Sequence, residues 1–306
     1  MLRVTDIDLR LLRIFKSVTD CGGFSAAETT LDMNLSTIST HMSELESRLG
    51  VRLCERGRQG FRLTDEGRAT YLLVEQLLNS VEDFRAGVGA IHQQIGGALG
   101  VGVVDNTLTD PQARISAAIL ALKQRGGDLH VRLEIKSPSE IEQAVQERRL
   151  HVGIVPSYNE LPGLRYEPLY TETLTLYCGS GHPLFDAAPD GVELTQLDGL
   201  DFVSRGYMRE NRELSSTARL NASATVHHME AVATLILSGA FVGYLPQHYA
   251  AQWVASQRMR PVRPDLLSQQ AAFSIVTRRD RGQTIAVQAF VDALRGNTAN
   301  ARPAGA

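Results

Sequence analysis

Two short helical patterns and then a basic segment broken by glycines lie between residues 24 and 64, and this order constrains the fold more than any other feature. Residues 25–28 read Ser-Ala-Ala-Glu, the pattern of a capping box in which Ser25 begins a helix and Glu28 bonds back to its amide. A polar break over 32–34 leaves room only for a tight turn before the next helix. The segment therefore predicts two helices joined by a turn.

The second of these helices has a clear apolar stripe. Ile38, Met42, Leu45 and Leu49 recur at helical spacing, and Gly50 follows as a C-terminal cap. Short polar side chains fill the opposite face: Ser36, Thr37, Ser39, Thr40 and Ser43. Such a helix can enter the major groove of DNA, where its side chains meet base edges and its leading N–H groups favour phosphate.

Residues 52–64 alternate around Gly57 and Gly60, which predicts a hairpin, and four arginines make it basic enough to follow a phosphate backbone. A merely solvated polar face is the alternative for the helix alone. The order of helix, turn, helix and basic hairpin favours DNA binding instead. The predicted DNA-binding residues are Ser25, Asn34, Ser36, Thr37, Ser39, Thr40, His41, Arg52, Arg56, Arg58 and Arg62.

A long helix is predicted over 65–95, after Thr64 as a possible N-cap and two acidic residues in the first turn. Its apolar residues follow the rhythm of a coiled-coil seam: Leu73, Leu77, Val81, Phe84, Val88, Ile91 and Ile95. Packing on its own domain is the alternative. A second copy of the chain would cover the stripe. We therefore expect a dimer interface formed by Leu73, Leu77, Val81, Phe84, Val88 and Ile91.

Strand and helix patterns alternate after Gly97. Strands are predicted at 99–104, 131–135 and 152–155 with helices at 111–122 and 139–149, an order that indicates parallel pairing. A second series has strands at 173–177, 202–203, 225–226 and 241–246 and a helix at 228–238. A strand at 271–277 and a helix at 284–294 follow, and 297–306 is expected to be a flexible tail. The fold class is therefore α/β behind an all-α winged head.

Ligands of open parallel sheets bind beyond the carboxyl ends of the strands. These ends give the predicted effector-binding residues: Asp105, Asn106, Thr107, Ser137, Ser139, Pro156, Ser204, Arg205 and His227. Arg205 suits a carboxylate, whereas Asp105 suits an amine. Each has a structural alternative, since Ser137 and Ser139 could cap a helix, Arg205 could form an inter-lobe ion pair, and His227 or His228 could be a surface group.

Charge and cysteine content limit the setting. The net charge of −3 is not uniform, because a basic excess lies within residues 48–62. The chain begins without an apolar signal core and has no membrane-length apolar stretch, so we expect a cytoplasmic protein without a membrane partner. Cys21, Cys54 and Cys178 have no metal-ligand spacing, and Cys178 ends an apolar run that disfavours redox sensing. No metal or cofactor is predicted.

The head resembles the winged helix-turn-helix of LysR-type transcriptional regulators. The resemblance rests on Phe24-Ser25-Ala26-Ala27, Leu31, Leu35-Ser36-Thr37-Ile38-Ser39, Leu45-Glu46, Leu49-Gly50-Val51-Arg52-Leu53, Glu55-Arg56 and Leu63-Thr64-Asp65-Glu66-Gly67. The family usually has glutamine at position 35 and often arginine at position 40, where this chain has leucine and threonine. Without an arginine on the recognition helix, bidentate guanine readout from it is not expected.

The resemblance implies a domain organisation. A winged head spans 1–64, a linker helix that pairs antiparallel spans 65–95, and an effector domain similar to periplasmic binding proteins spans 96–296. Lobe I would comprise 96–166 and 269–296 and lobe II 167–268, with the chain crossing twice between them. Dimers or tetramers would bind near-palindromic promoter sites.

A ligand-responsive transcriptional regulator is therefore the predicted function, with double-stranded DNA, a small-molecule effector, itself and, for an activator, RNA polymerase as partners. An enzyme is the alternative, but the chain has no nucleophile elbow, phosphate loop, paired metal ligands or dinucleotide fingerprint. A solute carrier fits poorly behind a DNA-binding head. The residues do not determine the effector, the operator, the target genes or the sign of regulation.

Overall fold

The computed structural model describes residues 6–57, 60–91, 97–126, 128–157, 160–188, 191–206, 220–279 and 284–296. The chain forms two compact units, residues 1–85 and 86–306. The division falls within α4 (Asp65–Ile91), and each unit is described by itself. No helix in the described part of the chain is both long enough and apolar enough to cross a bilayer.

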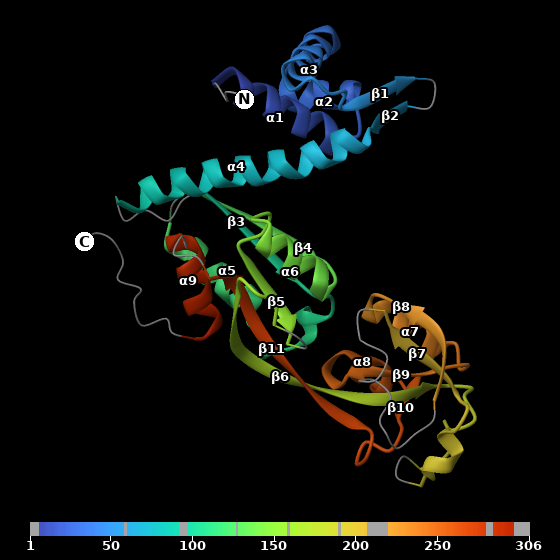
Figure 1. The fold of residues 1–306 in the computed structure, drawn as a ribbon. Helices are drawn as coiled ribbons and strands as arrows, with labels where there is room; N and C mark the ends of the chain where they lie inside the picture. Colours follow the sequence, from blue (N-terminus) through green and yellow to red (C-terminus); the bar gives the residue numbers. More distant parts are fainter. Residues whose placement is uncertain are drawn as a thin grey trace. The chain divides into compact units, whose positions relative to one another are not determined.

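The first unit contains α1 (Asp6–Asp20), α2 (Phe24–Leu31), α3 (Leu35–Leu49), the hairpin β1 (Cys54–Gly57) and β2 (Gly60–Leu63), and the start of α4 (Figure 1). One apolar core joins these elements. Its buried side chains include Phe15 of α1, Ile38 and Met42 of α3, Leu53 before the hairpin and Val74 of α4. The stripe predicted for the second helix is thus the side that α3 buries.

The capping box predicted at Ser25 is wrong. Helix α2 begins at Phe24, and its N-cap is Gly23, which makes no side-chain capping bond. The carboxylate of Glu28 is used elsewhere, since its Oε1 accepts from the backbone N–H of Leu35 at 2.6 Å. Glu28 therefore stabilises the turn into α3 rather than the start of its own helix.

Side chains and one glycine set the ends of α3. The Oδ1 atom of Asn34 accepts from the N–H of Thr37 at 2.9 Å, which is an N-cap bond. The predicted C-cap Gly50 has a left-handed φ of 69°, and its N–H donates to Glu46 O. Glu46 Oε1 also accepts from the N–H groups of Leu53 and Cys54, at 2.8 and 3.2 Å, so α3 and the hairpin are held together.

The predicted hairpin is present as an antiparallel pair in which Cys54 lies opposite Leu63 and Gly57 opposite Gly60. The Phe61 ring of β2 meets the Phe24 ring of α2 edge-on, with centroids 5.8 Å apart. This aromatic contact attaches the hairpin of β1 and β2, which is the wing of the head, to α2, the first helix of the helix-turn-helix.

Thr64 is the N-cap of α4, as expected, because its hydroxyl accepts from Gly67 N at 2.8 Å and donates to Arg52 O at 2.7 Å. This arrangement brings the backbone of α4 against the residue before β1. A Cβ atom on Gly67 would lie 1.9 Å from Leu53 O. The described part of α4 ends at Ile91, so residues 92–95 of the predicted helix lie outside the described residues.

The second unit begins with a parallel sheet in the order β4-β3-β5, formed by β3 (Gly97–Val103), β4 (Leu129–Ile135) and β5 (Val152–Pro156). Helices α5 (Ile115–Gln124), α6 (Pro138–Gln146) and α9 (Ile285–Leu294) accompany it. The predicted helix at 111–122 starts later than expected. A 3-10 turn, η1 (Thr107–Thr109), and a left-handed Arg114 precede it.

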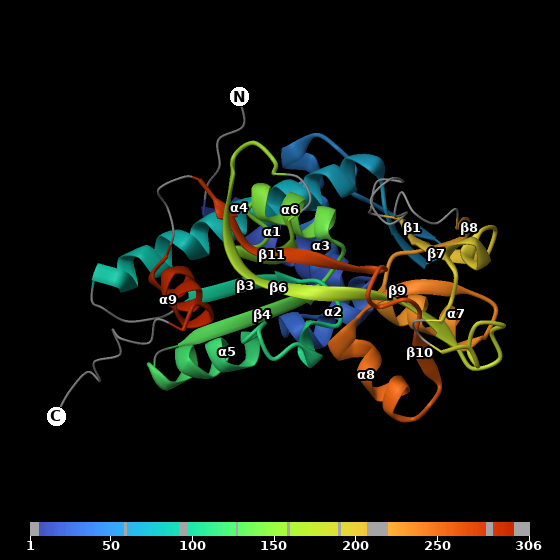
Figure 2. The same cartoon turned by 90° about the horizontal axis from the view of Figure 1, so that it is seen from below.

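Two long antiparallel strands connect the lobes of this unit: β6 (Leu164–Gly179) and β11 (Ser268–Arg278). Their register runs from Leu164 opposite Arg278 to Thr175 opposite Ser268, with an irregularity at Phe273/Ser274. Both views show these strands running from the sheet of the first lobe into that of the second (Figures 1 and 2). Strand β6 is much longer than the predicted strand at 173–177. The prediction missed residues 164–172 because charged and polar side chains interrupt their apolar pattern.

The second lobe contains η2 (Leu194–Leu197), β7 (Asp201–Arg205), β8 (Asn221–Val226), α7 (Met229–Leu237) and β9 (Val242–Pro246). Strand β7 pairs in parallel with β8 and β9, and β9 pairs antiparallel with β6. Helix α8 (Gln247–Ala255) and strand β10 (Met259–Pro261) were not predicted. Strand β11 then pairs with β5, so the end of the chain returns to the first lobe as expected.

We predict that Gly67→Ala destabilises the head by about 3 kcal/mol, because the added methyl group has to displace the Leu53 carbonyl. Gly50→Ala is a matched control, since a Cβ there meets nothing within 4 Å and only the left-handed backbone opposes it. That change should cost about 1 kcal/mol. Hydrogen exchange of peptides from the first unit of the intact chain measures both losses, and equal losses would contradict the packing described for Gly67.

Candidate DNA-binding surface and effector site

The exposed start of α3 forms one wall of a depression in the first unit. The depression has a volume of about 800 Å³ and is lined by the start of α2, the start of α3 and the wing: Gly22, Gly23, Phe24, Ser25, Ala26, Leu35, Ser36, Ser39, Gly60 and Phe61. The structure thus brings three predicted DNA-binding residues, Ser25, Ser36 and Ser39, together at one concave surface beside the wing.

The hydroxyls of α3 are bonded within the helix. Ser36 donates to Asn34 Oδ1 at 2.7 Å, and Thr40 donates to the carbonyl of Ser36 at 2.9 Å. Ser43 donates in the same way to Ser39 O at 3.0 Å. Rotation about χ1 redirects such a hydroxyl without moving the backbone, so these groups are available to base edges at small conformational cost.

The leading amides of α3 differ from expectation. The N–H of Leu35 donates to the Glu28 carboxylate and that of Thr37 to Asn34 Oδ1, so two of the N–H groups expected to favour phosphate already have partners. The negative charge of Glu28 also lies at this helix end. The arginines of the wing are therefore better placed for phosphate contact than these amides.

His41 is half-buried on α3, whereas Ser36 and Thr40 are exposed. Its side chain is 22% exposed, and Nδ1 lies 3.9 Å from Glu44 Oε2. Because this contact stays within α3, His41 is less suited to base readout than the exposed Ser36 and Thr40.

The wing presents Arg62 on β2, directly across from Glu55 of β1, and both residues are exposed. Arg52 is exposed just before the hairpin. Arg56 lies on β1 opposite Phe61, and Arg58 lies outside the described residues. The described wing thus carries two arginine side chains at the surface.

The apolar stripe of the linker helix α4 is partly half-buried and partly exposed. Leu77 is half-buried and packs against the core of the head, and Val81 is half-buried. Leu73, Phe84 and Val88 are 64%, 72% and 44% exposed. Ile91 is the last residue of α4. The helix therefore carries large apolar side chains that the described residues of a single chain leave open to solvent.

The predicted effector residue Asp105 joins the two lobes of the second unit. It follows β3, and its Oδ2 accepts from the backbone N–H of Met229, the first residue of α7, at 2.5 Å. His228 Nδ1 lies 3.8 Å from the same oxygen. Burial raises the pKa of Asp105, while the Met229 bond and the charges of His228 and Arg205 oppose that rise.

Arg205 ends β7 and is only 2% exposed, and the half-buried Ser204 precedes it. Its charge acts on Asp105, so these two residues face the same region. His227 is exposed, and its ring lies against Gly206, the residue that follows β7. A Cβ atom on Gly206 would lie 2.4 Å from His227 Cε1. The structure thus brings Arg205 toward Asp105 and places His227 at the surface beside them.

Ser137 acts as the N-cap of α6, which is the structural alternative that the sequence left open. Its N–H and Oγ both donate to Glu140 Oε2, at 3.0 and 2.5 Å. These bonds lower the pKa of Glu140, and the charge of His228 lowers it further. Because His228 directly precedes α7, the start of α6 lies on the side of the unit that faces α7. Ser139 is exposed in the first turn of α6.

The remaining predicted effector residues have local roles. The buried Thr107 donates to Val104 O at 3.3 Å. Asn106 has a left-handed φ of 60°, and its carbonyl accepts from Thr109 N. Pro156 is buried opposite Phe273 of β11. These three shape the strand ends, while Asp105, Ser137 and Arg205 supply the polar groups.

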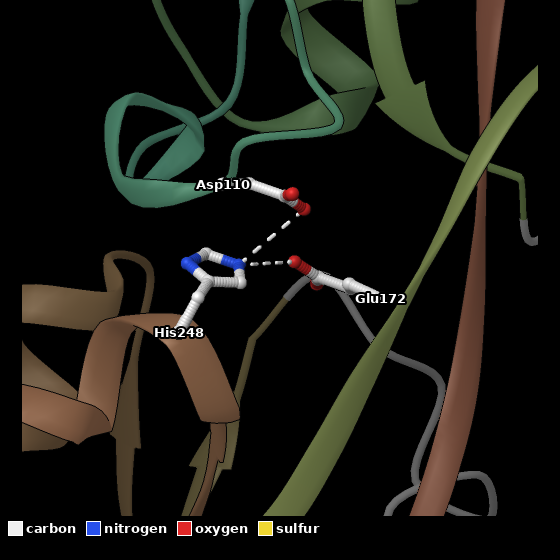
Figure 3. Close-up of side chains that lie close together, drawn as sticks. All are labelled: Asp110, Glu172 and His248. Atoms are coloured by element: carbon white, nitrogen blue, oxygen red, sulfur yellow. Dashed lines mark hydrogen bonds and ion pairs between the residues drawn. The ribbon is translucent and has the colours of Figure 1, made fainter.

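A second polar cluster was not predicted. Asp110, Glu172 and His248 come from the loop after η1, from β6 and from α8 (Figure 3). His248 Nε2 lies 3.2 Å from Glu172 Oε2 and 3.6 Å from Asp110 Oδ2. The rule that ligand residues follow strand ends could have indicated His248, because it comes just after β9. Glu172 and Asp110 lie in segments whose structure was not predicted.

Cys178 is fully buried on β6, as the sequence indicated. Burial raises the pKa of its thiol to about 11, and the nearby charge of Arg260 only partly offsets this effect. The thiol therefore stays protonated at neutral pH and is a poor nucleophile toward oxidants.

We predict that Asp105→Asn changes how stability depends on pH. Because burial raises the pKa of Asp105 above its ordinary 3.8, the folded chain binds more protons there than the unfolded chain just above that pH. The contribution of the carboxyl to stability therefore falls as pH rises through this window. Asparagine still accepts from Met229 N but does not titrate, so the stability of the variant relative to wild type should increase from about pH 4 to about pH 7.

Urea unfolding across this pH range measures the trend. Glu140→Gln provides a control of opposite sign, because hydrogen bonds from Ser137 lower the pKa of Glu140 and this variant should lose stability relative to wild type as pH rises. A pH-independent difference for Asp105→Asn would contradict the burial of its charge.

Comparison with known proteins places these two units in one family. Residues 9–68 match the family described as bacterial regulatory helix-turn-helix protein, lysR family, and residues 92–299 match the LysR substrate binding domain. The HTH-type transcriptional activator BauR of Pseudomonas aeruginosa is 44% identical over 292 residues, which are 95% of this chain and 96% of BauR. A probable hydrogen peroxide-inducible genes activator of Mycobacterium xenopi is 30% identical over 173 residues, covering 56% of this chain and 90% of that protein.

Solved structures agree on the fold. CbnR, a LysR family transcriptional regulator, matches with a TM-score of 0.64 at 19% identity, over 94% of this chain and 98% of CbnR. Full-length CbnR in complex with its target DNA matches with a TM-score of 0.62 at 20% identity and the same coverage. The chain therefore belongs to the LysR family of transcriptional regulators, with an N-terminal DNA-binding helix-turn-helix and a C-terminal effector-binding domain, and it is not an enzyme.

Proposed function

We propose that this regulator binds near-palindromic promoter DNA as a dimer or tetramer and responds to a small polar effector held between the two lobes of residues 86–306. The observation that carries the DNA-binding part is the depression shared by Ser25, Ser36 and Ser39 with the wing. Its small hydroxyl side chains suit base edges, and exposed arginines at positions 52 and 62 of the same unit suit phosphates. A DNA-binding regulator of this kind acts in the cytoplasm.

The proposed domain limits are 1–64 for the winged head, 65–95 for the linker helix and 96–296 for the effector domain, with lobe I formed by 96–166 and 269–296 and lobe II by 167–268. The long strands β6 and β11, which cross these lobe limits, support the division. The proposed flexible tail, 297–306, lies outside the described residues.

Asp105 and Arg205 are the proposed polar anchors of the effector, with Ser137 and His227 nearby. Arg205 suits a carboxylate and Asp105 an amine. The bond from Met229 N to Asp105 connects the lobes directly. An effector that competes for Asp105 would break this bond, and its binding would therefore favour one arrangement of the lobes over another.

The sign of regulation is proposed from the relative with the most extensive match described above. BauR is named a transcriptional activator and matches 95% of this chain. We propose that this chain also activates transcription, which implies contact with RNA polymerase. The peroxide trigger in the name of the Mycobacterium xenopi relative is not proposed here, because Cys178 is the single cysteine of residues 86–306 and is buried as a thiol.

The exposed stripe of α4 supports a dimer. Leu73, Phe84 and Val88 would lose water-accessible apolar area if two α4 helices packed together. Burying one large apolar side chain contributes about 1.5–3 kcal/mol to the free energy of association. In a symmetric dimer each residue contributes this amount from both copies.

We predict that Arg62→Ala weakens binding to every DNA sequence and lowers the salt dependence by about one counterion, because it removes a phosphate contact. Thr37→Ala should instead reduce discrimination by about 1 kcal/mol, because it removes a contact to base edges. Fluorescence anisotropy compares DNA from upstream of this gene with a shuffled sequence, in salt from about 50 to about 200 mM. Arg165→Ala, exposed in the second unit, is the matched control and should leave binding unchanged. Equal losses on both DNAs for Thr37→Ala would refute its role in readout.

We predict that Phe84→Lys weakens self-association at least about 100-fold, because each of two copies loses a buried aromatic ring and gains a charge. Glu82→Lys on the same helix is the control, since Glu82 faces away from the stripe and forms only a surface ion pair with Arg85. Sedimentation equilibrium measures the change. A dimer of unaltered affinity in Phe84→Lys would show that another surface holds the copies together.

A further inference from the structure

Three metal-ligating side chains meet inside the effector domain, and none of them is a proposed effector-binding residue. Asp110, Glu172 and His248 each offer one ligand atom, and these atoms all lie within 4.8 Å of one another. The carboxylate side chains are only 3% and 5% exposed and the imidazole 16%. Figure 3 shows the imidazole pointing from α8 toward both carboxylates. A cation bound between two buried carboxylates at this separation would offset their mutual repulsion.

A contact on the far side of the ring orients His248. Thr109 Oγ1 lies 2.8 Å from His248 Nδ1, and the same hydroxyl lies 3.1 Å from Asn106 O. This contact holds the ring with Nε2 toward both carboxylates. In the tautomer with the hydrogen on Nδ1, Nε2 has a free lone pair and can bind a cation that the carboxylates also hold.

We propose that Asp110, Glu172 and His248 form a binding site for a divalent first-row transition metal ion. Ligands at about 2.1 Å from such an ion in tetrahedral geometry lie about 3.4 Å apart. The Nε2–oxygen distances of 3.2 and 3.6 Å have that spacing. An imidazole combined with two carboxylates suits zinc, manganese, cobalt or iron better than calcium or magnesium.

The residues around the cluster support the ligands. Gln112 N donates to Asp110 Oδ1 at 2.8 Å, which leaves Oδ2 to face His248. Thr109 Oγ1 contacts the other ring nitrogen of His248 and orients the ring, as outer-shell partners of metal-bound histidines do. Both contacts come from the loop around η1, so one segment of the first lobe orients two of the three ligands.

Tyr170 provides an independent indication of a ligand. It lies two residues before Glu172 on the same face of β6, and its ring stacks on Phe273 with centroids 4.7 Å apart. Its hydroxyl oxygen is buried and has no hydrogen-bond partner among the described residues. Water in an open coordination position of the metal would give this hydroxyl a partner.

The proposed metal would connect three parts of the effector domain: the loop after η1 in the first lobe, the crossing strand β6, and α8 in the second lobe. A bound ion would therefore hold the lobes in the arrangement seen here. The three ligands are none of the residues proposed to bind DNA or the effector, so metal titration tests this proposal apart from the proposed function.

Cobalt titration of the untagged, chelator-treated full chain tests the proposal. Co²⁺ bound by nitrogen and oxygen ligands absorbs visible light, and Trp253, the single tryptophan, lies on α8 five residues after His248 as a second reporter. We expect one equivalent to bind with a change in both signals. His248→Gln and Glu172→Gln should each weaken binding at least about 100-fold. His130→Gln, an exposed histidine of β4, should bind like wild type.

Zn²⁺ should also raise the thermal midpoint of wild type and of His130→Gln, because it binds only the folded chain, while leaving that of the two ligand variants unchanged. Circular dichroism verifies that the variants fold, and Asp110→Asn serves if either does not. Failure of millimolar Co²⁺ to change absorption, or equal binding by the ligand variants and wild type, would overturn the proposal. The first result would show that the cluster is held by its own side-chain contacts alone, and the second would assign binding to adventitious surface groups.

Discussion

Backbone pairing between β6 and β11 is the interaction on which the effector domain depends. Each strand belongs to the sheets of both lobes, since β11 pairs with β5 at one end and β6 pairs with β9 at the other. The two strands are therefore a two-stranded connection around which the lobes can rotate without losing either sheet. Side-chain contacts between the lobes then help decide which arrangement is stable, and the described ones include two polar sets: Asp105 with α7, and the loop around η1 with His248 of α8.

Both inter-lobe contacts follow from where the strands end. Strand β3 delivers Asp105 to the start of α7, and β9 delivers His248 to the loop after η1. Neither contact is an apolar interface. A domain whose lobes meet through charged groups responds to small charged molecules or ions, because such ligands can replace or reinforce those contacts.

The sequence predicted the head well because its signals are local. The apolar stripe of α3, its cap Gly50 and the glycines of the wing act within a few residues of one another. The capping box failed because Glu28 had a competing partner, the Leu35 amide, which spacing alone does not reveal. Asp105 and Arg205 could be predicted from strand ends. The cluster of Asp110, Glu172 and His248 could not, because it depends on the register of β6 and on α8, whose short pattern has only a weak apolar side.

We propose that DNA binding by this chain depends on local charge and small hydroxyls and not on the net charge, which is −3. The measurement that tests this most directly is a nuclease footprint of the full chain on the DNA immediately upstream of its gene, with and without excess random DNA. The account predicts protection of an inverted repeat with half-sites about 34 Å, or one helical turn, apart, and protection that survives the competitor. Loss of this protection when random DNA is added in excess would contradict sequence-specific binding, because the head would then bind phosphate without reading sequence.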